Sequence, residues 1–179
     1  MRVIAGKLRG RRLEAPRGAG TRPTSDRVRE ALFSTLGDVA GNDVLDLFAG
    51  SGALGIEALS RGAGHAVFVE RGAQALAAIG ANLERLGLRD VCDVVRMPAL
   101  RALACAPVRE RLYDLVFLDP PYREAGSLGP ALSLALPPLL AKRATVVAES
   151  DRREPLELAL PVRSERRYGD TLLRFHVLG

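Results

Sequence analysis

The chain has 179 residues, of which 47% are hydrophobic and 26% are charged, enough for one domain with a hydrophobic core. It contains no run of about eighteen apolar residues and no secretory leader, so we expect a cytoplasmic protein that does not cross a membrane. The formal net charge is +5, but residues 1–29 carry +7 and the remaining residues sum to −2. This asymmetry indicates a polyanionic partner for the N-terminal part. The cysteines and histidines have no metal-ligand spacing, and we expect no metal site.

Residues 1–37 form a predicted basic extension. The pattern predicts a small hairpin over 2–14, a loop rich in glycine and proline, and a helix that begins near Asp26 with Thr24 or Ser25 as its cap. Arg27 and Arg29 lie off the apolar face of that helix. They form either a solvated helix edge or part of a basic surface.

Residues 38–179 alternate between predicted strands and helices. The expected strands are 44–48, 65–70, 91–97, 113–119 and 144–149, and the expected helices are 53–60, 73–86, 99–105 and one within 127–136. Residues 161–168 and 171–177 favour a closing antiparallel hairpin across Gly169 and Asp170. We therefore predict one α/β domain: a mostly parallel seven-stranded sheet with a C-terminal antiparallel hairpin, and helices on both faces.

The segment Val44 to Gly55 reads as a buried strand, a glycine turn and the start of a helix. Gly50 and Gly52 lack Cβ atoms, so a ligand can touch the backbone where the helix N-terminus presents its free N–H groups. Glu70 ends the next strand twenty residues after Gly50, a spacing that suits a carboxylate accepting both hydroxyls of a ribose. Taken alone, this pattern also fits a nicotinamide dinucleotide.

Asp46 is a carboxylate within the expected buried strand, which is costly unless the group is paired. It either caps neighbouring backbone amides or faces a cationic part of the ligand, and we favour the second interpretation. A pyrophosphate beside this carboxylate would be repelled, so a ligand with a ribose and a sulfonium charge, such as S-adenosylmethionine, fits better. We expect Asp46, Glu70 and Asp119 to converge on one crevice at the strand ends, with Glu149 serving structure or the substrate edge.

Asp119-Pro120-Pro121-Tyr122 follows the fourth predicted strand of the body. The two prolines remove backbone donors and leave carbonyls that, with the Asp119 carboxylate, suit an exocyclic amine. The Tyr122 ring offers a platform for an extruded base. The alternative is a plain turn with a buried tyrosine.

Both motifs, in this order, resemble the Rossmann-like S-adenosylmethionine-dependent methyltransferases that modify exocyclic amines of nucleic-acid bases. The segments Arg2-Val-Ile-Ala-Gly-Lys-Leu-Arg-Gly-Arg-Arg-Leu13 and Arg22-Pro-Thr-Ser-Asp-Arg-Val-Arg-Glu30 resemble the bacterial 16S rRNA guanine-N2 methyltransferase D family. The stretch from Leu45 to Ala63 and Tyr168-Gly-Asp-Thr171 match as well, so the similarity covers essentially the whole chain.

The resemblance implies methyl transfer to the N2 amine of one guanine in 16S rRNA, of the guanine-966 type, within a small-subunit assembly particle and by a monomer. The catalytic residues would be Asp119, Pro120, Pro121 and Tyr122. The residues that bind S-adenosyl-L-methionine would be Arg22, Thr24, Asp46, Phe48, Ala49, Gly50, Ser51, Gly52, Glu70, Arg71, Met97 and Ala99. No aspartate follows the third strand of the body near the adenine, so Met97 or Ala99 would pack against it. The RNA contacts would be Lys7, Arg9, Arg11, Arg12 and Arg27.

Three rival functions stay open at this point. An Asp-Pro-Pro-Tyr pocket also suits an adenine-N6 methyltransferase acting on DNA or RNA. The glycine turn alone suits an NAD-dependent oxidoreductase, although the sequence offers no evident hydride-transfer acid. The basic N-terminal part alone suits a non-catalytic RNA-binding protein.

Overall fold

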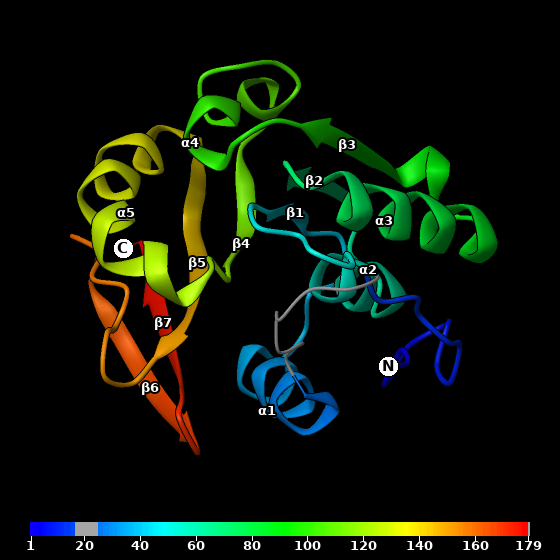
Figure 1. Ribbon diagram of the computed structural model, residues 1–179, viewed down its shortest axis with the longest axis horizontal. Helices are drawn as coiled ribbons and strands as arrows, with labels where there is room; N and C mark the ends of the chain where they lie inside the picture. The colour runs from blue at the N-terminus through cyan, green and yellow to red at the C-terminus, as the bar shows by residue number, and fades with distance from the viewer. Residues whose placement is uncertain (17–24, 179) are drawn as a thin grey trace.

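The computed structural model describes residues 1–16 and 25–178. Within them one sheet has the strand order β3-β2-β1-β4-β5-β7-β6 (Figure 1). Its strands are β1 Asp43–Asp46, β2 His65–Glu70, β3 Cys92–Arg96, β4 Tyr113–Leu118, β5 Leu140–Asp151, β6 Val162–Tyr168 and β7 Thr171–Val177. Strands β1 to β5 are parallel, and β7 runs antiparallel between β5 and β6. This confirms the predicted fold class.

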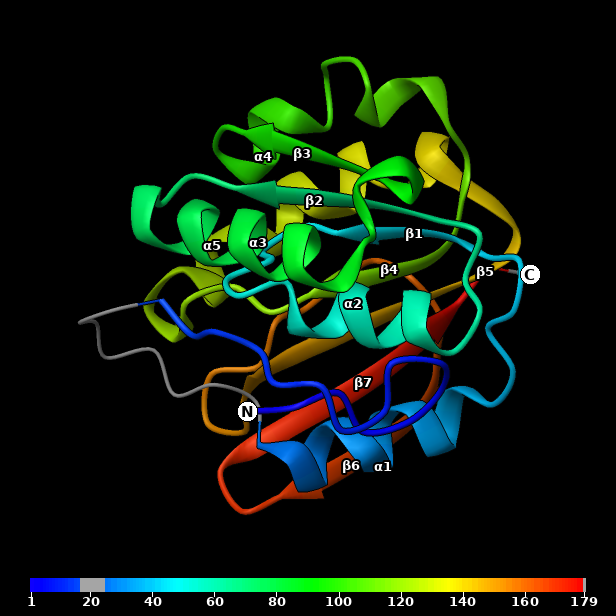
Figure 2. The same ribbon diagram turned by 90° about the vertical axis from the view of Figure 1, so that its right-hand side faces the viewer.

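The helices cover both faces of the sheet (Figure 2). On one face lie α1 Asp26–Leu36, α2 Ala53–Ser60 and α3 Ala73–Leu86, and on the other lie α4 Ala99–Ala102 and α5 Tyr122–Ala135. Short 3-10 turns occupy Arg89–Val91, Val108–Glu110 and Pro137–Leu139. Because successive strand residues point to opposite faces, neighbours such as Leu45 and Val44 are buried in two different cores.

The chain reverses its direction of travel across the sheet at β1. It moves outward from β1 to β2 and β3, then returns to place β4 on the other side of β1. The carboxyl ends meet in register there, because Asp46 pairs with both Phe68 of β2 and Phe117 of β4. Ligands of such sheets bind at this switch point.

Four elements differ from the expected bounds by two residues or more, namely β1, α4, α5 and β5, whereas β3, β4 and β6 differ by one residue at one or both ends. Helix α4 ends at Ala102 rather than at 105. Strand β1 ends at Asp46, because the chain turns at Leu47, although the Leu47 N–H still donates to the Phe117 carbonyl of β4 at 3.1 Å. Helix α5 begins at Tyr122 rather than after 127, because burial of its apolar side against the sheet outweighs its glycines and proline. Strand β5 continues from 140 to 151, because it pairs with β4 along one edge and β7 along the other.

The N-terminal arm, residues 1–16, reverses as expected but pairs only at one bridge, Arg2 with Arg12. It lies along α2 (Figure 2): the Met1 Sδ is 3.7 Å from the Ser51 Oγ, and the Lys7 N–H donates to the Ser60 carbonyl at 2.7 Å. The arm therefore follows α2 from the glycine turn to the opposite edge of the sheet. Among the described residues, no helix is both long and apolar enough to cross a bilayer.

Candidate active site

The glycine turn between β1 and α2 is built on two left-handed residues. Gly50 has φ +56° and Gly52, the residue before α2, has φ +78°. A Cβ placed on Gly50 would meet nothing within 4 Å, whereas one on Gly52 would lie 3.3 Å from the Ile56 Cδ1. At Gly52 the absence of a Cβ allows the turn to pack against the core. At Gly50 the backbone is open, so a ligand can approach it.

Glu70 binds three backbone amides at the end of β2. Its Oε2 accepts from the Gly50 N–H at 2.9 Å, and its Oε1 accepts from the N–H groups of Arg71 at 2.7 Å and Gly72 at 2.8 Å. The carboxylate therefore joins the glycine turn to the end of β2 and binds the two amides that precede α3. A carboxylate has about four acceptor positions, so a ribose would share this group with the amides. The sequence pattern located Glu70 but not these partners.

Asp46 is 2% exposed, and its Oδ2 accepts from the Gly55 N–H in α2 at 3.0 Å. Burial raises the pKa of Asp46 to about 7, opposed by the Gly55 hydrogen bond and reinforced by the negative charge of Glu70. One carboxyl oxygen of Asp46 therefore caps a backbone amide of α2, the interpretation that the sequence favours less. That Asp46 also faces a cationic ligand stays a prediction.

Asp119, Pro120 and Pro121 follow β4 at the end of the sheet where the neighbouring strand β1 leads into the glycine turn. Pro121 precedes α5, and its carbonyl accepts from the Glu124 N–H at 2.8 Å. The first turn of α5 therefore already uses the Pro121 carbonyl, and the predicted part of this carbonyl in binding an amine stays a prediction. The Asp119 carboxylate and the Pro120 carbonyl are the remaining predicted acceptors. Arg22, Thr24 and the Tyr122 side chain lie outside what the structure describes.

An ion pair links the segments that follow β2 and β4, the two strands on either side of β1. Arg71 follows β2 and its guanidinium pairs with the Glu124 carboxylate on α5. The pair joins the strand that carries Glu70 to the helix that follows Asp119. Sequence reasoning missed Glu124, because its partner is 53 residues away.

Three predicted adenine or turn residues, Phe48, Met97 and Ala99, are partly buried against the core beneath α4 and α5. The Met97 N–H donates to the Glu70 main-chain carbonyl at 3.1 Å, so the backbone of Met97 lies beside the end of β2 that carries Glu70. Ala49 is buried and its N–H donates to the Val69 carbonyl at 3.0 Å. These contacts bring the predicted cofactor residues to one end of the sheet.

A buried ion-pair network under the arm was not foreseen. Arg29 is fully buried, not a solvated edge, and its side chain reaches Asp26 at 3.0 Å, the Arg2 carbonyl, and Glu57 at 4.0 Å. Glu57 in turn accepts from the N–H groups of Ile4 at 2.8 Å and Ala5 at 3.0 Å. The sequence signal was a single carboxylate, Glu57, in an otherwise apolar helix, whereas nothing in the charged start of α1 distinguished Arg29.

The predicted RNA contacts Lys7, Arg9, Arg11, Arg12 and Arg27 are all exposed. They do not form one cluster. Arg12 faces Arg2 near the glycine turn, whereas Lys7 lies at the far end of α2.

The strand order, the glycine turn and the acidic strand ends together define a Rossmann-like methyltransferase, a class whose cofactor is S-adenosyl-L-methionine. Comparison with known proteins then gives the family. The sequence model described as "Conserved hypothetical protein 95" matches residues 1–177, and the chain belongs to this family. The glycine turn is therefore that of a methyltransferase rather than of an oxidoreductase.

Three relatives illustrate the similarity. A putative rRNA methyltransferase YlbH of Bacillus subtilis is 44% identical over 157 residues, which cover 87% of this chain and 85% of the relative. Ribosomal RNA small subunit methyltransferase D of Escherichia coli is 43% identical over 124 residues, 69% of this chain but only 61% of the relative. The solved structure of the putative methyltransferase yhhF from Escherichia coli superimposes with a TM-score of 0.82 at 35% identity, covering 99% and 97% of the two chains.

Proposed function

We propose that this protein methylates 16S rRNA of the small ribosomal subunit, at the exocyclic N2 amine of one guanine of the guanine-966 type. The observation that carries the proposal is the position of Asp119 and Pro120 at the end of β4, next to the glycine turn of β1. The names of the relatives from Bacillus subtilis and Escherichia coli support rRNA as the substrate class.

The residues at the strand ends fit S-adenosyl-L-methionine. Glu70 supplies a carboxylate for the ribose, the open face of Gly50 lets the backbone be approached, and Met97 supplies an apolar surface. When bound, the cofactor supplies an electrophilic methyl group. The Asp119 carboxylate accepts a hydrogen bond from the target amine and thereby fixes the direction of its lone pair. The protein itself thus contributes by positioning the amine and by electrostatic stabilisation of the transition state.

The substrate is bound by the basic N-terminal part. Lys7, Arg9, Arg11, Arg12 and Arg27 are exposed cations that contact phosphates, which makes binding dependent on salt. We further propose that the protein acts as a monomer in the cytoplasm, without a metal, on a partly assembled subunit. Sedimentation of the purified protein and an unchanged rate in a chelator would agree with this.

The decisive experiment is methyl transfer from labelled S-adenosylmethionine to small subunits from cells that lack this protein, with duplex DNA in parallel. Mass mapping then locates the modified nucleotide. We expect one N2-methylguanine in 16S rRNA and no label in DNA. A label on an adenine N6 would instead establish the rival methyltransferase function, and no label in either substrate would refute the proposal.

A further inference from the structure

Two arginines of the N-terminal arm, Arg2 and Arg12, face each other directly. Their bridge is flanked by hydrogen bonds from the Val3 N–H to the Arg11 carbonyl at 2.9 Å and from the Leu13 N–H to the Met1 carbonyl at 3.0 Å. In this kind of antiparallel pair the two Cα atoms are about 4.5 Å apart and the side chains leave the same face. Like charges directly opposite one another destabilise such a pair. The arm therefore keeps an electrostatically unfavourable arrangement at this position.

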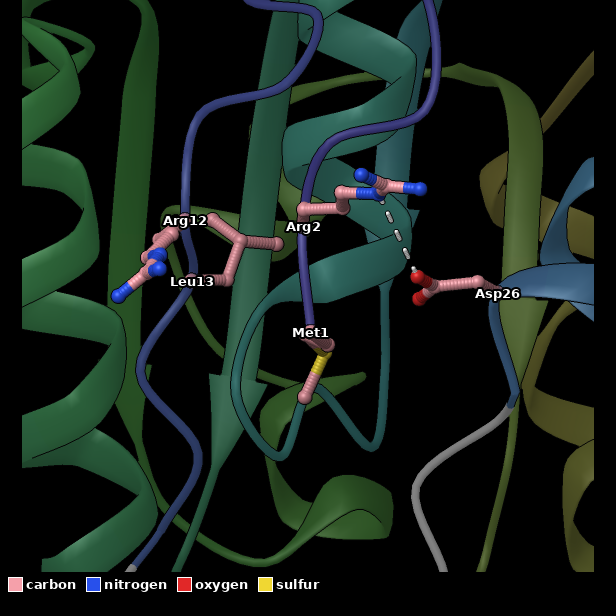
Figure 3. A pocket seen from close by; sticks show the side chains of 5 residues that line it. All are labelled: Met1, Arg2, Arg12, Leu13 and Asp26. Atoms are coloured by element: carbon pink, nitrogen blue, oxygen red, sulfur yellow. Dashed lines mark ion pairs between the residues drawn. The ribbon is translucent and has the colours of Figure 1, made fainter.

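Neighbouring carboxylates offset this repulsion only weakly. The Arg2 Nε lies 4.0 Å from the Asp26 Oδ2 with 71% of its side chain exposed, and the other Asp26 oxygen pairs with Arg29 at 3.0 Å. Arg12 makes no ion pair with any residue in the described part of the chain. Figure 3 shows the Arg2 guanidinium turned toward Asp26 and the Arg12 guanidinium turned to the other side. The two exposed cations are thus separated but not neutralised.

These arginines border an open surface depression between the arm and the start of α1 (Figure 3). Met1 and Leu13 supply its apolar part, and Arg2, Arg12 and Asp26 supply its charged part. Guanidinium groups bind phosphate through charge-assisted hydrogen bonds. An apolar surface beside them suits the sugar or base of the same nucleotide. The Asp26 carboxylate in the lining is paired with Arg29 at 3.0 Å and with Arg2 at 4.0 Å, and the remaining lining residues suit a nucleotide of an RNA strand.

The depression adjoins the glycine turn, because Met1 lies against Ser51 with 3.7 Å between the sulfur and the hydroxyl oxygen. Lys7 and the tip of the arm are at the other end of α2, whose eight residues span about 12 Å at 1.5 Å per residue. The arm thus offers cations at two separate places along one helix. Only the place at Arg2 and Arg12 is next to the proposed cofactor site.

We propose that Arg2 and Arg12 together bind one backbone phosphate of the RNA substrate at this depression, close to the nucleotide that is methylated. Lys7 and Arg9 contact the RNA farther from the reaction. This site rests on the proposed function, because it assumes an RNA substrate. Binding one phosphate requires both guanidinium groups to turn inward from the diverging positions in Figure 3. The phosphate then removes the repulsion that the free protein tolerates.

The test is the substitution Arg12→Glu, which places opposite charges across the bridge. We expect the melting temperature to rise, because repulsion becomes attraction. We expect RNA affinity to fall at the same time, with the slope of log K against log salt smaller by about 0.7 to 0.9 for the lost phosphate contact. Binding of S-adenosylhomocysteine should be unchanged. A rise in stability together with a loss of RNA binding is a result that a purely structural role does not give.

The matched control is Arg109→Glu, an exposed arginine at the opposite edge of the sheet that undergoes the same change of charge. Its melting temperature should not rise and its KM for undermethylated small subunits should stay near that of the wild type. Arg2→Gln, which keeps the carbonyl bonded to Arg29, should also raise the KM. An unchanged KM in Arg12→Glu, or a lower melting temperature, would overturn the phosphate site. If the wild type methylates no rRNA at all, the proposed function itself fails.

Discussion

The Gly50 N–H donates a 2.9 Å hydrogen bond to the Oε2 of Glu70, joining the glycine turn after β1 to the end of β2. The same carboxylate binds the first amides before α3. The group that is predicted to hold the ribose therefore also fixes the shape of the turn. Substitutions of Glu70 should therefore remove the predicted ribose contact and also alter the conformation of the glycine turn.

Glu70→Gln should weaken binding of S-adenosylhomocysteine by about tenfold or more, since a hydrogen bond to a charged group contributes roughly 1.5–3 kcal/mol. The glutamine amide also brings an N–H group toward backbone donors that need an acceptor. Titration calorimetry measures the affinity. Glu84→Gln, at an exposed site paired with Arg89, is the control and should bind normally. Equal affinities for the two variants would contradict a ribose-binding role.

Asp119→Asn should lower kcat by about 100-fold while leaving the affinity for S-adenosylhomocysteine unchanged. The reason is that the asparagine has one acceptor where the carboxylate has two and lacks its charge. Single-turnover methyl transfer to undermethylated subunits measures the rate. Glu110→Gln, an exposed change before β4, should retain full activity. A loss of activity that merely follows a loss of cofactor affinity would remove Asp119 from the catalytic residues.

Asp46 gives a prediction about pH. Because its pKa is raised from 3.8 to about 7 in the fold, the folded state binds more protons than the unfolded state between these values. The stability contributed by this group is fully present below about pH 4 and is lost as the pH rises through about 7. The unfolding free energy of Asp46→Asn relative to the wild type should therefore increase from pH 4 to 7 and then level off.

Urea denaturation of both proteins at several pH values measures this difference. The asparagine oxygen can still accept from the Gly55 N–H, so the comparison isolates the charge. If Asp46 also faces the sulfonium of the cofactor, affinity should rise through pH 7 in the wild type and not in the variant. A constant stability difference across the range would argue against a raised pKa.

Arg29→Met should destabilise the protein by about 3–5 kcal/mol, the usual cost of removing one partner of a buried ion pair. Glu57 would keep its charge at 1% exposure, with its bond to Arg61 and the arm amides remaining. Chemical denaturation measures the loss. Arg27→Met, two residues earlier in α1 and exposed, should change stability by less than about 0.5 kcal/mol. Similar losses in both variants would show that the buried pair is not what holds α1.

The sequence predicted the elements that carry a strong local pattern. Strand β2 and helix α3 were expected at 65–70 and 73–86 and lie at those residues. Their apolar periodicity and the glycine after α3 define them without help from distant residues. Helix α5 and strand β5 were predicted too short, because their ends depend on packing and pairing that no local pattern records.

The sequence alone determined the class of fold, the glycine turn and the order in which Glu70 and Asp119 reach the strand ends. Each of these follows from residues close together in the chain, where periodicity and backbone preference act. Only the tertiary structure decided that Arg29 is buried against Glu57, that the Pro121 carbonyl belongs to α5, and that Arg2 stands opposite Arg12. The first depends on partners 28 residues apart, and the other two depend on where the chain turns.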